Sequence, residues 1–153
     1  MNTSPEAVKK IAGFEGVKLV PYNDLSGNAT EGVGHLMHKG PLLDNEKVPE
    51  TMDKAMSDFA EDLKNRSEKY IVAFIKTPLN QNQFDALSSF CYNLGCGTLK
   101  TLVSETGLND GKYDAVPSEI LKYNKSRVKG VLAPVDGLTR RRQWESELFK
   151  ART

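Results

Sequence analysis

The chain has 153 residues, the length of one domain, and its charge is nearly balanced, with 21 Lys and Arg against 20 Asp and Glu. Hydrophobic residues make up 39% of the chain and charged residues 27%, as in a globular protein and unlike a disordered or collagen-like one. No stretch approaches the roughly 18 consecutive apolar residues of a membrane-spanning helix, so we expect no membrane insertion. The first residues carry no signal-peptide pattern, so we expect synthesis in the cytoplasm and, for a target outside, release by a separate factor.

Basic residues gather toward the C-terminal end. Between residues 122 and 152, nine Lys and Arg stand against three Asp and Glu. This excess suits an anionic partner, either nucleic acid or cell wall, and it equally suits a solvated helix face. The two cysteines, Cys91 and Cys96, have no His or further Cys nearby to complete a tetrahedral site. We therefore expect two reduced thiols, no bound metal and no cofactor.

The first predicted element is a helix with an acidic residue at its end. Ser4 and Pro5 form a typical helix start, and apolar residues then recur at helical spacing. Gly16 ends the helix and places Glu15 on its last turn. Leu19 to Tyr22 and Thr30 to His35 follow as two short strands around a run of turn-forming residues, and we expect them to form the only sheet.

The rest of the chain reads as helical. Apolar residues from Met52 to Leu63 form one helical stripe, and Asn80 with Gln83 resembles the capping box of a central helix that stops at Gly95. Shorter helices are predicted near 98–106 and 114–123, followed by a loop and a final helix. We therefore expect one α+β domain over 1–153, with a helix and small antiparallel sheet at about 1–40, a helical lobe at about 41–153, and a cleft between the lobes.

The most informative polar residues flank the predicted sheet. Glycoside hydrolysis needs one carboxylic acid to protonate the leaving oxygen and a second group that acts on water or on the sugar. Glu15 and Asp24 could face each other across a cleft, and Thr30 could help to hold a water molecule. The negative end of the helix dipole and a shielded cleft favour the protonated form of Glu15, whereas a loop rich in donors favours ionised Asp24.

Three ordered motifs extend this pattern over nearly the whole chain. They are Phe14-Glu15-Gly16 with Leu19, Tyr22, Asp24 and Thr30-x-Gly32-Val33-Gly34-His35; Leu79 to Leu87 with Ser89 to Gly95; and Gly137-Leu138-x-x-Arg141-Arg142-x-x-Glu145 with Leu148-Phe149. Together they resemble the phage lysozymes of glycoside hydrolase family 24. The resemblance implies a lysozyme-like fold and a muramidase that causes bacterial lysis by cutting β-1,4 bonds between N-acetylmuramic acid and N-acetylglucosamine.

The resemblance also implies roles for individual residues. Glu15 would be the general acid, and Asp24 and Thr30 would position the attacking water in an inverting mechanism. Tyr92 and Asn93 match positions that line the substrate cleft, although core or capping roles remain open for both. The implied partner is the peptidoglycan glycan strand, bound by a monomer, with no nucleic acid.

Several residues leave alternatives open. Position 31, usually apolar in the family, is Glu here. This glutamate is either solvated or paired with a nearby base, or it changes the charge of the cleft, or it weakens activity. His35 is expected to be a structural hydrogen-bonding residue rather than a catalyst. Arg141 or Arg142 either reaches Glu15 or lies on the surface.

Two rival functions also remain open. A lytic transglycosylase needs the acid but no water-holding partner, so Asp24 and Thr30 favour hydrolysis. A module that binds the wall or nucleic acid without catalysis would use the basic C-terminal region, but the chain lacks a recognisable nucleic-acid-binding signature.

Overall fold

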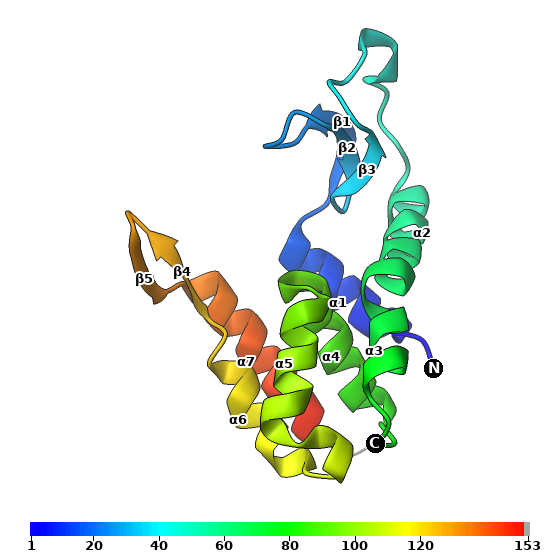
Figure 1. Cartoon of the computed structure of the whole chain (residues 1–153). Helices are drawn as coiled ribbons and strands as arrows, with labels where there is room; N and C mark the ends of the chain where they lie inside the picture. The colour runs from blue at the N-terminus through cyan, green and yellow to red at the C-terminus, as the bar shows by residue number, and fades with distance from the viewer. Residues whose placement is uncertain (152–153) are drawn as a thin grey trace. The chain divides into compact units, whose positions relative to one another are not determined.

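The computed structural model describes residues 1–151, which group into two compact units (Figure 1). The sheet unit is Pro5–Asp62. The helical unit consists of Met1–Ser4 with Leu63–Thr153, of which the described part ends at residue 151. The sequence placed the change from sheet to helices near residue 40, whereas the first long helix after the sheet groups with the sheet itself.

In the sheet unit, one helix precedes the three strands in the sequence and another follows them. Its elements are α1 (Pro5–Glu15), β1 (Lys18–Asn23), β2 (Ala29–Gly32), β3 (His35–His38), the 3₁₀ turn η1 (Asp44–Glu46) and α2 (Met52–Leu63). The strands are antiparallel in the order β1-β2-β3. The predicted first helix is confirmed: its buried side is apolar, and Gly16 leaves the helix at φ 85°.

The prediction of one strand from Thr30 to His35 is wrong. The chain turns between β2 and β3, so that Glu31 pairs with His35 across the sheet. Gly32 and Gly34 both have positive φ, at 61° and 62°, which only glycine adopts readily. A side chain at Gly32 would also bring its Cβ within 2.6 Å of Glu50 Oε1, so this tight turn depends on glycine.

The helical unit is built around one buried helix, α4. Its elements are the π-helical turn η2 (Lys64–Glu68), α3 (Lys69–Phe74), α4 (Gln81–Leu94), α5 (Cys96–Thr106), the 3₁₀ turns η3 (Leu108–Asp110) and η4 (Tyr113–Ala115), α6 (Val116–Leu121), β4 (Lys125–Val128), β5 (Val131–Pro134) and α7 (Asp136–Lys150). Nine consecutive residues of α4 are buried, and the predicted capping box is present, with Asn80 accepting from the Gln83 N–H. Among the described residues, no helix is both long and apolar enough to cross a bilayer.

The prediction of a single sheet is also wrong, because β4 and β5 form a second, two-stranded one. The sequence predicts a loop here, because the segment carries Gly130, Pro134 and Gly137. Every residue of β4 is exposed, as are most of β5, so no alternation of buried and exposed side chains marks these strands. Lys129 and Gly130, at φ 51° and 79°, make the tight turn between the strands.

The first four residues join the helical unit rather than the sheet unit. The Thr3 N–H and hydroxyl both donate to Glu68 Oε2, at 3.2 and 2.9 Å, and the hydroxyl also lies 2.7 Å from Ser88 Oγ. The Ser4 N–H and hydroxyl donate to the two carboxylate oxygens of Asp85 at 2.9 and 2.6 Å. These bonds bind the N-terminal arm to residues 65 to 85 positions away in the sequence.

Candidate active site

The three proposed catalytic residues all belong to the sheet unit. Glu15 is the last residue of α1, and its side chain is exposed. The Gly16 N–H donates to the Ala12 carbonyl at 2.8 Å and completes the final helical turn. The sequence therefore folds locally to place an acidic side chain at the carbonyl end of a helix, directly before the sheet.

Asp24 is held by the loop that it opens. Its Oδ1 accepts from the Ser26 N–H and the Asn28 N–H, both at 2.9 Å. The Asp24 N–H donates to the Asn28 carbonyl at 2.9 Å, and the Gly27 N–H donates to the Asp24 carbonyl at 3.0 Å. One oxygen is therefore fixed by backbone donors, which orients the carboxylate and leaves Oδ2 as the oxygen suited to accept a proton from water.

Thr30 lies in the middle strand and is only 3% exposed. Its hydroxyl donates to the Asn28 carbonyl at 2.9 Å, the same residue whose N–H binds Asp24. Because the hydroxyl proton is used in this bond, the oxygen of Thr30 is left with acceptor capacity for a water O–H. Asn28 therefore connects Asp24 and Thr30 through two backbone groups.

Tyr92 and Asn93 lie near the end of α4 in the helical unit, and both have partners there. The Tyr92 side chain is 7% exposed; its hydroxyl accepts from Arg66 Nη1 at 3.1 Å, and the Arg66 guanidinium lies 4.4 Å from its ring centroid. Asn93 Oδ1 accepts from Arg142 Nη2 at 2.8 Å. Both residues therefore make structural contacts, as in the core or capping roles that were left open for them. Their role in sugar binding stays a prediction.

Arg141 and Arg142 are buried, contrary to the surface position that the sequence left open. They flank Glu145, which is fully buried: Arg142 Nε lies 2.7 Å from its Oε1, and Ser89 Oγ donates to its Oε2 at 2.5 Å. Burial raises the pKa of Glu145 to about 7, against the lowering effect of Arg142, Ser89 and Arg141. This carboxyl is closed off from solvent, so it belongs to the packing of α4 against α7.

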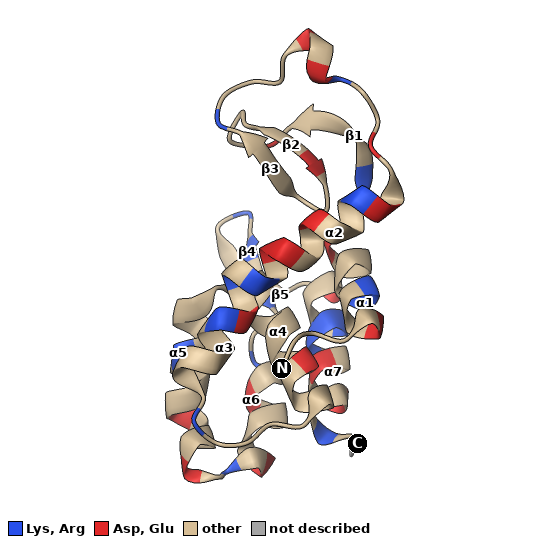
Figure 2. Ribbon diagram, turned by 90° about the vertical axis from the view of Figure 1, so that its right-hand side faces the viewer, with Lys and Arg blue, Asp and Glu red and all other residues tan. Residues whose placement is uncertain are grey.

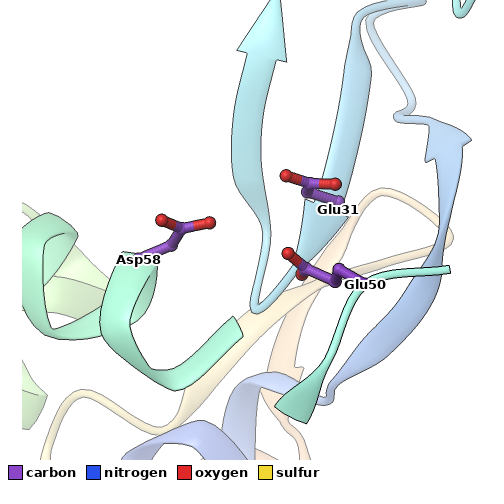
Figure 3. Close-up of side chains that lie close together, drawn as sticks. All are labelled: Glu31, Glu50 and Asp58. Carbon is purple, nitrogen blue, oxygen red and sulfur yellow. The ribbon is translucent and has the colours of Figure 1, made fainter. Parts of the chain in front are cut away.

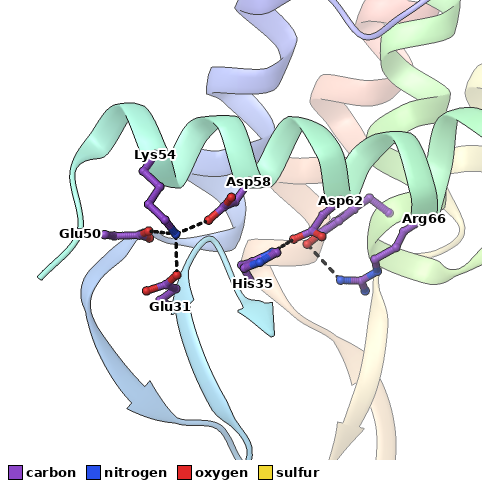
Figure 4. Close-up of polar contacts among 8 residues, drawn as sticks. Glu31, His35, Glu50, Lys54, Asp58, Asp62 and Arg66 are labelled. Atoms are coloured by element: carbon purple, nitrogen blue, oxygen red, sulfur yellow. Dashed lines mark hydrogen bonds and ion pairs between the residues drawn. The ribbon is translucent and has the colours of Figure 1, made fainter. Parts of the chain in front are cut away.

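A second cluster, the Lys54 cluster, joins Lys54 to Glu31, Glu50 and Asp58 (Figure 4), and Figure 3 shows its three acids alone. Lys54 Nζ donates to Glu31 Oε1, Asp58 Oδ2 and Glu50 Oε2, at 2.8, 2.9 and 3.1 Å. These hydrogen bonds raise the pKa of Lys54 above its usual value, with Glu31 as the largest contributor. Of the alternatives left open for Glu31, the structure shows the pairing with a base.

The three acids of the Lys54 cluster are also the one group of potential metal ligands among the described residues, with donor atoms within 4.8 Å of one another. The Lys54 ammonium lies at the centre of this group and supplies the cation. This cluster was not predicted from the sequence, although the spacing of Glu50, Lys54 and Asp58 by four residues is a signal of ion pairs along a helix. Asp62, farther along α2, lies beside His35 of β3, with 2.8 Å between Asp62 Oδ2 and His35 Nδ1. This contact agrees with a structural role for His35.

Comparisons with known proteins match nearly the whole chain. The phage lysozyme family model matches residues 12–145. The chain is 31% identical over 153 residues to the endolysin of Acyrthosiphon pisum secondary endosymbiont phage 1, covering 99% of both proteins. It superposes on the muramidase domain of SpmX from Asticaccaulis excentricus with a TM-score of 0.83 at 26% identity, and on a P22 lysozyme with a TM-score of 0.79 at 30% identity, covering 99% of each chain.

Proposed function

The chain belongs to the phage lysozyme family, and we propose that it hydrolyses the β-1,4 bond between N-acetylmuramic acid and N-acetylglucosamine in peptidoglycan. At the coarser level the chain is a lysozyme, a glycoside hydrolase that degrades peptidoglycan. The bond, the mechanism and the residue roles are the proposal. It includes action by a single lysozyme-like domain as a monomer, at the wall in the periplasm, after release by a separate factor.

The observation that carries the mechanism is the arrangement of Asp24, Asn28 and Thr30. Backbone donors hold one oxygen of Asp24, and the Asn28 carbonyl takes the proton of the Thr30 hydroxyl. We therefore expect Asp24 Oδ2 and the Thr30 oxygen to accept the two protons of one water molecule. In an inverting reaction, Asp24 removes a proton from that water as it attacks the anomeric carbon, while Glu15 protonates the leaving oxygen.

A direct test of Glu15 uses two variants of the same helix. Glu15→Gln keeps the shape of the side chain and removes the acid, so lysis of outer-membrane-stripped Gram-negative cells should fall by about 10²–10⁴-fold or more. Glu6→Gln makes the same chemical change in the first turn of α1 and should leave lysis nearly unchanged. Lysis by Glu15→Gln at the rate of the Glu6→Gln control would remove Glu15 from the mechanism.

Product analysis separates hydrolysis from its nearest rival. Mass analysis of the released muropeptides should show reducing ends, whereas anhydro ends would identify a lytic transglycosylase. An NMR time course should show the α anomer first, because inversion at a β-linked sugar produces α. The β anomer as the first product would replace the inverting mechanism with a retaining one.

A further inference from the structure

The hairpin formed by β4 and β5 is exposed on both faces. Val128, Val131 and Leu132 are 50%, 65% and 59% exposed, an unusual concentration of open apolar side chains on eight strand residues. Neither strand makes more than slight contact with any described helix of the helical unit. A two-stranded hairpin without support from a core is marginally stable in water, so its exposed faces are suited to contact with something else.

The strand register divides the side chains of this hairpin between two faces. Partners across the two strands share a face, and successive residues alternate between faces. Val128 pairs with Val131 and Ser126 with Ala133, so one face carries two exposed valines and no charge. Lys125 pairs with Pro134 and Arg127 with Leu132, so the opposite face carries two cations beside two apolar side chains.

All charged side chains of the hairpin are cationic. Residues 120–135 include no Asp or Glu, and Lys125, Arg127 and Lys129 lie within five positions. In Figure 2 the turn beside β4 is coloured only for Lys and Arg. Such a surface complements an anionic partner and repels a cationic one.

The turn between the strands contains a lysine, Lys129, in a backbone conformation that is unfavourable for this residue type. Lys129 has φ 51°, the left-handed conformation that Asn, Asp and Gly adopt more readily and that two-residue hairpin turns require. It is the only non-glycine residue with positive φ in the described part of the chain. Arg127 Nη1 donates to the Gly130 carbonyl at 3.2 Å, which closes the turn and keeps a second cation near its tip.

We propose that this hairpin docks the enzyme on an anionic lipid bilayer. The Val128–Val131 face lies at the boundary between headgroups and acyl chains. The flexible stems of Lys125, Arg127 and Lys129 reach back to lipid phosphates. The apolar face decides between anionic partners, because wall glycan and its polar peptides offer no apolar layer in which to bury valines. This contact is peripheral, goes beyond the proposed catalytic function, and places the enzyme at a membrane surface next to its substrate.

The test measures co-sedimentation of the full chain with lipid vesicles. Vesicles of phosphatidylglycerol mixed with phosphatidylcholine should bind the enzyme, less so as salt rises, and pure phosphatidylcholine vesicles should not. Arg127→Gln with Lys129→Gln should weaken binding about 25-fold, at about fivefold per cation. The matched control, Lys9→Gln with Lys76→Gln, removes the same charge elsewhere and should bind like the parent.

Two further measurements test the apolar face. Val128→Ser with Val131→Ser should reduce the binding that persists at high salt. Val131→Trp should show a blue shift of its fluorescence on phosphatidylglycerol vesicles beyond that of the parent's Trp144. All hairpin variants should digest purified, lipid-free sacculi at the parental rate, so failure of this proposal is distinct from failure of the catalytic one.

Two outcomes would overturn the proposal. The first is binding to phosphatidylglycerol vesicles that is equal in the hairpin variants and the control. The second is unchanged vesicle binding with lost binding to purified sacculi, which would assign the hairpin to the wall polymer instead. Thermal unfolding of each variant, followed by circular dichroism, establishes that the comparison is made between folded proteins.

Discussion

Replacing Lys54 by Met should destabilise the protein, because three acidic side chains would lose the one ammonium group with which they all pair. The side chains of Glu50 and Glu31 are only 4% and 11% exposed, whereas that of Lys54 is 54% exposed. Removing one partner of a buried ion pair costs about 3–5 kcal/mol, and an exposed pair contributes about 0.2–1 kcal/mol. The Lys54 cluster lies between these limits, so we expect a loss of about 2 kcal/mol in the free energy of unfolding, or about 4–8 °C in Tm for a domain of this size.

The pH dependence has a definite sign. Because the pKa of Lys54 is raised by the carboxylates of Glu31, Asp58 and Glu50, its contribution is fully present at neutral pH and is lost only as the solution becomes strongly alkaline. In Lys54→Met, the three carboxylates lie close together with no cation between them, so the folded state loses stability through the repulsion of their negative charges. The deficit in stability relative to the parent should therefore shrink as the pH falls from 7 toward 5.

Thermal and urea unfolding at both pH values provide the assay. Lys47→Met is the matched control, because Lys47 pairs with Asp44 at 3.2 Å where Asp44 is fully exposed. Glu31→Ile combined with Lys54→Met should recover part of the loss, since it removes one of the repelling charges. Equal stability of Lys54→Met and Lys47→Met at pH 7 would refute the reasoning.

Three further predictions concern the catalytic pair, a surface histidine and metal ions. Asp24→Asn keeps the Oδ1 acceptor for Ser26 and Asn28 but loses the charge, so it should fold normally and lose about 10²–10⁴-fold in lysis rate; parental activity would exclude Asp24 as the base. The pKa of His38 is raised by hydrogen bonds to the Lys39 carbonyl and the Glu46 carboxylate, so its NMR titration midpoint should exceed that of a free histidine and should fall in Glu46→Gln. The stability from this pair should be lost as the pH rises through the His38 pKa, and an unchanged midpoint in the variant would contradict its cause. EDTA should leave lysis of stripped walls unchanged, and a loss that zinc restores would show a metal requirement.

The sequence predicted most accurately where local rules and core packing agree. Helix α4 has a capping box, a continuous apolar surface and a terminal glycine, and all three point to the same segment. The end of α1 at Glu15 was equally predictable, because Gly16 alone accounts for it. These two helices carry or flank the residues that the family motif singles out.

The errors have two physical causes, contacts between segments far apart in the sequence and the absence of a buried face. At the turn after β2, a Cβ on Gly32 would come within 2.6 Å of Glu50 Oε1, a contact that no local pattern contains. The Lys54 cluster required knowing that Glu31 lies beside α2. The β4–β5 hairpin escaped detection because it has no buried face, and burial is what produces the alternation used to identify strands.

The N-terminal arm has a consequence for the order of events during synthesis. Thr3 and Ser4 leave the ribosome first, but their partners Glu68, Asp85 and Ser88 are made 65 to 85 residues later. At typical translation rates of 5–20 residues per second, this delay is about 3–17 s, during which the sheet unit can fold and the arm cannot dock. The helical unit is therefore completed by residues that are made well before the rest of it. A fragment that begins at Leu63 lacks these residues.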